Sequence, residues 1–197
     1  MSEVHPIEAE SYRILRSRID LSDRPPLSRA VTERIIHATA DFDYVTDLVC
    51  DEAALAAGAA ALQDDAPVIA DVAMVAAGIT KYQVTCKIGD SLAARLARTA
   101  NITLSAAAVR LAFGEAGPGA IWLVGCAPTA LTEIISREVE PALVIGVPVG
   151  FVGAAAAKDE LRASGLPALT NVSEKGGSAV AVAAFNALLR IARDSAL

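Results

Sequence analysis

The stretch ALVIGVPVGFVGAAAAKDELRASGLPALTNV, residues 142–172, decides the fold of this chain. It begins with an apolar run, Ala142–Val147, passes through a glycine-rich loop into a helical stretch, Ala154–Ser164, and ends in a second apolar run, Ala168–Val172. Short runs rich in valine and isoleucine, bounded by turn residues, are typical of strands that are buried on both faces. Two such strands joined by a helix predict a β-α-β unit of a parallel sheet.

The same alternation continues through the rest of the chain beyond the first forty residues. The further apolar runs predicted as strands are Pro67–Ala70, Gln83–Ile88 and Ala120–Val124, and the further helical stretches are Asp51–Gln63, Thr129–Glu138 and Gly177–Arg193. Alternating strands and helices indicate a mostly parallel sheet flanked by helices on both faces. We therefore expect a three-layer α/β fold. Because no linker or internal repeat interrupts residues 1–197, we take them as a single domain.

The first forty residues differ, because they predict two helices and no strand. The first helix opens at His5-Pro6, and the second begins after Pro25 and runs to about Asp41. At about 100° per residue, the apolar stripe of the second helix contains Leu27, Val31, Ile35, Ala38 and Phe42. We expect these two helices to form an N-terminal helical arm.

Composition and charge exclude several classes of protein. The formal net charge is −6 and only 4% of the residues are aromatic, so the chain lacks the basic face and the stacking side chains of a nucleic-acid-binding protein. Mean hydropathy is +0.45, but charged residues interrupt every apolar run before the ~18–20 residues that a membrane span needs. The first five residues lack the basic start of a secretory leader, so we expect a cytoplasmic protein with no membrane partner.

The three cysteines and two histidines do not predict a metal site. Cys50, Cys86 and Cys126 lie far apart and form no CxxC pair, and local spacing does not join them to His5 or His37 in a zinc cluster. An odd number of cysteines without a secretory context also argues against a disulfide framework. We expect all three to be small buried residues, since free cysteine is usually buried.

His37 is the side chain best suited to proton transfer near neutral pH. It lies about 120° from the centre of the apolar stripe, on the flank of its helix. Asp41 follows four residues later, where its carboxylate is expected to hydrogen-bond the ring and raise the pKa of the imidazole. Taken alone, however, a histidine in a helix is more often a structural or surface residue. His5, near the terminus, is expected to be idle.

Ligands of open parallel sheets bind beyond the carboxyl ends of the strands, which points to the loops there. The loop Gly146–Gly153 matches neither the dinucleotide-binding nor the Walker motif. Gly176-Gly177-Ser178 precedes the last helix, where free N–H groups and the helix dipole favour an anion. A tight turn with an N-cap serine explains the same residues equally well. The residues thus predict loops suited to an anionic ligand and one acid–base histidine.

A more specific pattern comes from several segments that occur in a fixed order. They are Pro6–Ser11 with Arg16, Glu33–Ala38, Ala66–Ile79, Ala127–Leu131, Gly146–Ala155 with Lys158, and Gly176–Ser178. Together they span nearly the whole chain and resemble the precorrin-8X methylmutase family, also called precorrin isomerase. The resemblance implies an α/β fold, a homodimer with active sites near the subunit interface, and an isomerase of cobalamin biosynthesis that needs no cofactor and no metal.

The resemblance also implies a substrate and roles for individual residues. Family members move a methyl group from ring carbon 11 to ring carbon 12 of the corrinoid precorrin-8X, which gives hydrogenobyrinate. His37 matches the catalytic histidine, which would protonate or hydrogen-bond a ring nitrogen. The substrate carboxylates would be bound by backbone N–H groups and by arginine. The expected substrate-binding residues are Ser11, Arg16, Thr80, Thr129, Gly150, Gly153, Gly176, Gly177 and Ser178, with Arg13 as an alternative to Arg16.

One position departs from the family pattern. Family members often have Thr-Arg-Ser-Ala-Ala-Ala where residues 103–108 of this chain read Thr-Leu-Ser-Ala-Ala-Ala. An arginine expected to face a substrate carboxylate is therefore replaced by Leu104. Arg110, farther along the same helix, is the candidate substitute.

Three alternatives stay open at this point. The sequence does not distinguish the methyl shift on the metal-free ring from the same shift on cobalt-precorrin-8. A non-catalytic corrinoid-binding carrier would hold the intermediate without converting it, although a carrier has no need of a proton donor such as His37. A nucleotide-binding α/β domain is disfavoured, because the phosphate-binding motifs are missing.

Overall fold

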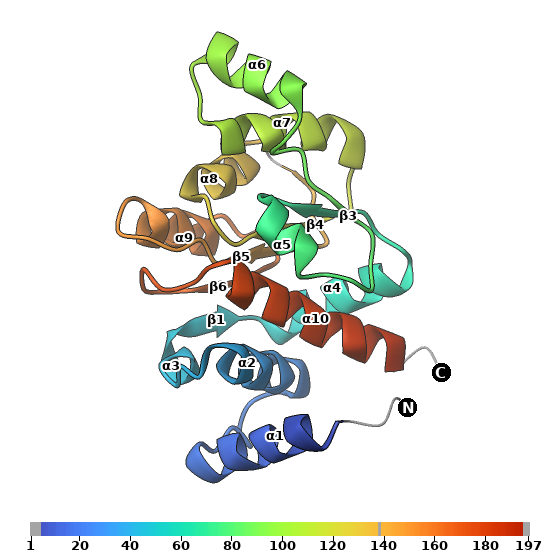
Figure 1. Cartoon of the computed structure of the whole chain (residues 1–197), viewed down its shortest axis with the longest axis vertical. Coiled ribbons are helices and arrows are strands. Elements are labelled where there is room, and N and C mark those ends of the chain that lie inside the picture. The colour runs from blue at the N-terminus through green and yellow to red at the C-terminus, as the bar shows by residue number, and fades with distance from the viewer. Residues whose placement is uncertain (1–4, 138, 195–197) are drawn as a thin grey trace.

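The computed structural model describes residues 5–137 and 139–194 (Figure 1). The helices are α1 (Pro6–Arg18), α2 (Pro26–Thr39), α3 (Tyr44–Asp47), α4 (Glu52–Gln63), α5 (Ala73–Ala77), α6 (Ser91–Ala100), α7 (Leu104–Ala116), α8 (Pro128–Ser136), α9 (Ala154–Ala163) and α10 (Ser178–Asp194). The strands are β1 (Leu48–Cys50), β2 (Val68–Ala70), β3 (Val84–Thr85), β4 (Ile121–Val124), β5 (Leu143–Gly146) and β6 (Ala168–Asn171). Residues 1–4, on which the expectation about a leader rests, and Glu138, the expected end of one helix, lie outside the described residues.

The described strands form one mixed sheet in the order β1-β6-β5-β4-β2-β3. All neighbouring pairs are parallel except β1 and β6, where Leu48 lies opposite Asn171. The segment 142–172 forms β5, α9 and β6, with Val144 opposite Ala168. The predicted α/β fold with a mostly parallel sheet is confirmed.

Helices cover both faces of the sheet, and each face has its own hydrophobic core. Because side chains alternate along a strand, Ile121 and Leu123 of β4 enter one core, together with α2, α4 and α10. Trp122 and Val124 enter the other core, together with α7, α8 and α9. Strands buried on both sides, such as β4 and β5, thus produce the three layers that their continuous apolar sequence predicts.

The N-terminal arm packs against the long helix α10. α2 lies along α10 and contributes the buried Val31 and Ile35 to the core. α1 packs on α2 farther from the sheet, and within α1 only Leu15 is buried (Figure 1). The arm therefore has an inner helix that belongs to the core and an outer helix at the edge of the molecule.

The end of α2 differs from the expectation. The helix ends at Thr39 instead of near Asp41, because Ala40 adopts a left-handed conformation, with φ 54°. Ala38, expected in the apolar stripe, is exposed, whereas Thr32 and Ile36 are buried. The buried face of α2 is therefore rotated relative to the predicted stripe, and the chain changes direction before Asp41.

Two edges of the sheet also differ from the expectation. The run Gln83–Ile88 forms only the two-residue strand β3, and β1 has no counterpart among the predicted strands.

The expectation that all cysteines are buried is wrong: Cys50 and Cys86 are half-buried and Cys126 is exposed. The reason is their position, since Cys50 ends one edge strand, Cys86 follows the other, and Cys126 lies in the turn after β4.

Two further properties concern residues 5–137 and 139–194. Each helix in these ranges is too short or too polar to cross a membrane. The same ranges contain no group of three or more histidine, cysteine or acidic side chains that could hold a metal ion.

Candidate active site

The loops that follow the parallel strands meet at the carboxyl edge of the sheet. A Cβ atom added to Gly125, after β4, would lie 2.9 Å from Cα of Ser178, the first residue of α10. A Cβ atom added to Gly153, after β5, would lie 3.7 Å from the side chain of Pro128 in α8. The structure therefore brings Gly153 and Ser178, both predicted to bind substrate, to the same edge.

The loops after β5 and β6 are packed directly on each other. Gly176 has φ 146°, and a Cβ atom there would lie 2.3 Å from the carbonyl oxygen of Val147, so only glycine fits. Gly177 donates its N–H to that same carbonyl at 2.9 Å, and Gly150 donates its N–H to the carbonyl of Glu174 at 3.0 Å. Two of the N–H groups expected to bind substrate are therefore engaged within the protein.

Asp71, directly after β2, is buried beneath the turn that leads into α8. Its carboxylate accepts hydrogen bonds from the N–H groups of Gly125 at 3.1 Å, Cys126 at 2.8 Å and Ala127 at 3.0 Å. Burial raises the pKa of Asp71 above its ordinary value, and the N–H donors oppose this shift. A carboxylate of the protein thus holds the turn before α8, while the N–H of Thr129 in the first turn of α8 is not among its donors.

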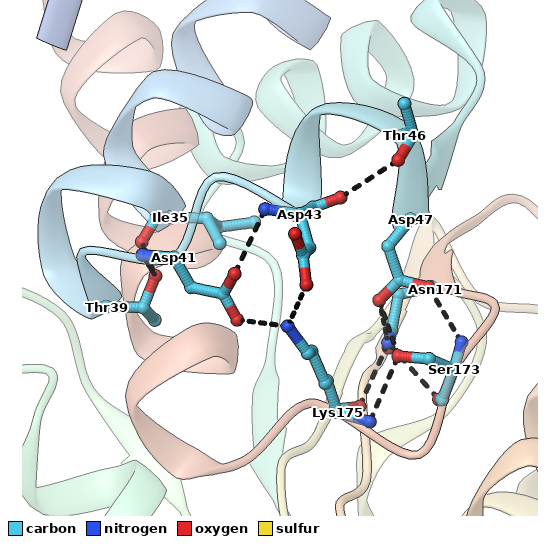
Figure 2. Close-up of polar contacts among 9 residues, drawn as sticks. All are labelled: Ile35, Thr39, Asp41, Asp43, Thr46, Asp47, Asn171, Ser173 and Lys175. Carbon is cyan, nitrogen blue, oxygen red and sulfur yellow. Dashed lines mark hydrogen bonds and ion pairs between the residues drawn. The ribbon is translucent and has the colours of Figure 1, made fainter.

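The N-terminal arm reaches the same edge because β1 runs antiparallel to β6. Figure 2 shows the contacts that fix it there: Nζ of Lys175, in the loop after β6, pairs with Asp41 at 2.7 Å and with Asp43 at 2.5 Å. The hydrogen bond from this ammonium holds the pKa of Asp41 below its ordinary value. The segment that follows α2 is therefore attached to the loop that precedes Gly176.

His37 lies in the last turn of α2 and is half-buried. Its Nδ1 is 2.8 Å from Oγ of Ser11 in α1, and the ring of Tyr12 stacks on the imidazole with centroids 4.9 Å apart and planes 8° apart. The prediction that Asp41 hydrogen-bonds the ring is wrong, because Asp41 follows the left-handed Ala40 and pairs with Lys175. Ser11 is the partner, and Nε2 has none among the residues that the structure describes.

A second layer of side chains lies beside this histidine. The guanidinium of Arg16 lies 5.6 Å from the centre of the Tyr12 ring and forms a two-pronged ion pair with Glu33, at 2.9 and 2.7 Å. The hydroxyl of Tyr12 is buried and has no hydrogen-bond partner within the described part of the chain. Arg13, the alternative carboxylate ligand, pairs with Glu10 on the surface. Both candidate arginines therefore have an acidic partner already.

Thr80 is exposed and lies beside the middle of α10. It follows Gly78, whose carbonyl accepts a hydrogen bond from Asn186 at 3.3 Å, and a Cβ atom at Gly78 would lie 2.6 Å from Val182. The carbonyl of the next residue, Lys81, accepts a hydrogen bond from Arg193 near the end of α10, so Thr80 lies well away from the glycine loops at the start of that helix.

Thr129 lies in α8, on the face of the sheet opposite α2. Its hydroxyl is 2.7 Å from that of Thr103. Both hydroxyls line a concave region of about 490 Å³, whose lining residues are Asn101, Ile102, Thr103, Ala106, Thr129, Thr132 and Glu133. The structure does not place Thr129 together with His37 within one chain.

The expected substitute for the arginine at position 104 is not free. Leu104 is exposed at the start of α7, but the guanidinium of Arg110 pairs with Glu133 at 2.6 Å. Glu133 is largely buried and also holds Arg137, at 2.6 Å. Arg110 can therefore meet a substrate carboxylate only if it shares its ion pair with Glu133, and its role as the substitute stays a prediction.

Comparison with known proteins adds an independent finding. The family model described as precorrin-8X methylmutase matches residues 6–191, almost the entire chain. The chain belongs to the precorrin-8X methylmutase family. A cobalt-precorrin-8 methylmutase of Salmonella typhimurium is 38% identical and aligns over 96% of each chain. A precorrin-8X methylmutase of Pseudomonas aeruginosa is 36% identical over 92% of this chain and 93% of that protein. The crystal structure of the Thermus thermophilus precorrin-8X methylmutase superposes with a TM-score of 0.88 at 35% identity, covering 97% of each chain.

Membership in the methylmutase family gives the class of reaction, an isomerisation in cobalamin biosynthesis. The structure, in turn, shows two residues to which the sequence alone assigned no role. Asp71 carries a usable signal, since an acidic residue directly after a buried strand lies where turn N–H groups converge. Tyr12 carries none, because its stacking on His37 joins two helices whose packing the sequence does not specify.

We expect Asp71→Ala to lower the free energy of unfolding by about 2–4 kcal/mol, because buried N–H groups lose a charged acceptor. Asp71→Asn keeps one acceptor oxygen and should lie between this variant and the wild type. Urea unfolding measures the effect. Asp159→Ala is the control, since Asp159 is an exposed acid in a surface pair with Arg162, and it should cost less than about 1 kcal/mol. Equal losses for Asp71→Ala and Asp159→Ala would contradict the capping role.

Proposed function

We propose that this chain moves a methyl group from ring carbon 11 to ring carbon 12 of precorrin-8X and releases hydrogenobyrinate. The arrangement around His37 carries the proposal: Ser11 holds Nδ1, Tyr12 supports the face of the ring, and Nε2 is left for a ligand. The Pseudomonas and Thermus relatives are named for precorrin-8X. Because the Salmonella relative is named for cobalt-precorrin-8, the same shift on the cobalt-bearing ring is the second candidate.

The proposed mechanism needs a proton but no oxidant and no cofactor, because substrate and product contain the same atoms. Nε2 of His37 donates a proton or a hydrogen bond to a ring nitrogen, the changed conjugation eases the methyl migration, and the proton then returns to Nε2. Ser11 suits either role: its hydroxyl accepts from an Nδ1–H that stays in place when Nε2 gives up a proton, and it donates to a bare Nδ1 when Nε2–H only donates a hydrogen bond. Acid assistance of this kind typically contributes about 10²–10⁴-fold.

The carboxylate arms of a corrinoid give the other predicted residues their proposed roles. Ser178 begins α10, where unpaired N–H groups and the helix dipole favour a carboxylate, and Gly176 and Gly177 lead into that turn. Thr80 and Thr129 are exposed and offer hydroxyl donors. These residues are therefore proposed to bind the acetate and propionate arms.

The remaining predicted residues have more restricted roles. Arg16 can reach a substrate carboxylate only if it shares its ion pair with Glu33. Gly150 and Gly153 have φ 132° and 79°, values that glycine adopts readily, so they shape the loop after β5. We propose that this loop and Arg16 border the substrate, and that the enzyme works in the cytoplasm.

Exposed apolar side chains near the site support a homodimer. Phe151 and Val152, at the tip of the loop after β5, are 97% and 91% exposed, and Ile7 of α1 is 75% exposed. Phe151 and Val152 are neighbours in the chain, and exposed apolar patches of this kind usually mark an interface. We propose that a second copy of the chain covers these residues, so that each active site adjoins the subunit boundary.

We expect the homodimer to appear as a species of twice the chain mass in sedimentation equilibrium at micromolar concentration. Replacing Phe151 by Ser removes apolar contact area, so it should weaken the dimer. Leu92→Ser is the control, because Leu92 is an exposed leucine on α6, away from the loop after β5. A wild-type chain that stays monomeric would contradict this assembly.

We expect His37→Ala to lower kcat by at least about 10²-fold, because the variant has no proton donor at this position. Binding of hydrogenobyrinate, measured by calorimetry, should change little, since the carboxylate contacts are intact. His5→Ala is the matched control, as His5 is exposed at the start of α1 and should leave kcat unchanged. Equal rates for wild type and His37→Ala would exclude this role for the imidazole.

The substrate is tested by supplying precorrin-8X and cobalt-precorrin-8 separately and following the absorption spectrum of the ring. We expect conversion of precorrin-8X to be the faster of the two. Faster conversion of the cobalt-bearing ring would favour the second candidate. Tight binding of either ring without any spectral change would instead support a carrier and contradict the proposed activity.

A further inference from the structure

Lys158, in α9, is fully buried, although the proposed reaction does not use it. Its Nζ donates to Oδ1 of Asn171 at 3.0 Å, to the carbonyl of Lys175 at 2.7 Å, and to the carbonyl of Ser173. A buried ammonium is costly unless its donors are satisfied. Here each of the three N–H donors has an oxygen acceptor, and all three acceptors lie at the end of β6 or in the loop after it.

Asn171 and Asp47 complete this polar cluster (Figure 2). The amide of Asn171 donates to the carboxylate of Asp47 at 2.8 Å and to the carbonyl of Lys175 at 2.9 Å. Asp47 also accepts the N–H of Ser173 at 2.7 Å and its hydroxyl at 2.8 Å. Side chains from α3, β6 and α9 therefore converge on one short loop.

The geometry of the peptide bond links this cluster to the proposed substrate site. The carbonyl of Lys175 and the N–H of Gly176 belong to the same peptide plane, and in a trans peptide they point in opposite directions. Lys158 and Asn171 hold that carbonyl toward the interior. The N–H of Gly176 is consequently directed away from the cluster. It has no acceptor among residues 5–137 and 139–194.

We propose that Lys158 is a positioning residue for substrate binding: it holds the carbonyl of Lys175 inward, so that the N–H of Gly176 points toward a substrate carboxylate. Gly176 is the last residue but one before α10, so this contact lies close to the first turn of that helix. The inference rests on the proposed function, because the carboxylate belongs to the corrinoid that this function names.

The protonation of Lys158 provides a signature that a purely structural residue would lack. Burial lowers the pKa of Lys158 to about 8; Arg162 adds to this shift, while Asp47 and Glu174 oppose it. Loss of the proton leaves two N–H donors for three acceptors, so the hold on the loop weakens above that pH.

The effect on stability has the opposite sign. Between pH 8 and the ordinary lysine pKa of 10.5, the unfolded chain binds more protons at this residue than the folded chain does. The contribution of Lys158 to the free energy of unfolding therefore rises with pH in this interval. As the pH rises above 8, we therefore expect substrate binding to weaken while Lys158 causes no loss of stability.

The test compares Lys158→Met with the wild type at pH 7. We expect Lys158→Met to raise KM for precorrin-8X, and Kd for hydrogenobyrinate, by about tenfold or more, since a charge-assisted hold on the loop is lost. The kcat value should change by less than about threefold, because His37 is untouched. Amide hydrogen exchange of residues 173–179, measured without ligand, should accelerate, while that of α2 should not. Lys87→Met is the matched control, as Lys87 forms a surface pair with Glu115.

The wild type supplies a second measurement that does not depend on a variant that folds. Its KM should rise between pH 7 and pH 9.5 with a midpoint near pH 8, and any fall of kcat over the same range reports the proton that His37 donates. Unchanged KM in Lys158→Met, or a KM that stays flat over this pH range, would overturn the inference. Failure of the proposed function looks different, because the wild type would then neither bind hydrogenobyrinate nor convert precorrin-8X.

Discussion

The carboxylate of Asp47 is the group on which the geometry of the site depends. It lies where the antiparallel strand β1 begins, and it accepts hydrogen bonds from Asn171 and from the N–H groups of Val172 and Ser173. Burial alone would raise its pKa, but these donors outweigh burial and keep the pKa of Asp47 below its ordinary value. α2 is followed by α3, which ends at Asp47, and the loop after β6 leads into α10. Together with the pairs of Lys175 with Asp41 and Asp43, Asp47 therefore fixes the helix that carries His37 relative to the helix that begins at Ser178.

The sequence predicts those parts of the structure that depend on the order of apolar and polar residues within one short segment. The segment 142–172 predicts β5, α9 and β6 because continuous apolar runs alternate with a helical stretch. β1 was missed because its three residues are too few to show a pattern, and the contact that anchors it joins residues 124 positions apart. Spacing along a helix led to Asp41 as the partner of His37. No glycine or proline marks the left-handed turn at Ala40 that separates them.

Glycine-rich loops and helix starts predicted places where an anion can bind, but the protein itself uses several of those N–H groups. The carboxylate of Asp71 accepts hydrogen bonds from the turn before α8, and carbonyl groups of neighbouring loops accept the N–H groups of Gly150 and Gly177. The same sequence features describe a loop that binds a ligand and a loop that binds another loop, because both require free N–H groups and backbone freedom. Within residues 5–137 and 139–194, the N–H groups of Gly153, Gly176 and Ser178 have no acceptor, and a few hydroxyls are exposed.

An acidic chain that binds an acidic ligand cannot rely on its overall charge, which is −6. Several acidic side chains are paired with cations in place: Glu33 with Arg16, Glu133 with Arg110 and Arg137, and Asp41 with Lys175. Because these arginines are already paired within the protein, they are less available to bind a carboxylate of the ligand. The carboxylates of the ligand are then attracted by backbone N–H dipoles. These act only at short range and only when the N–H points toward the carboxylate. Because the N–H of Gly176 must point toward the ligand, the fold keeps the ammonium of Lys158 buried, where it orients the loop after β6.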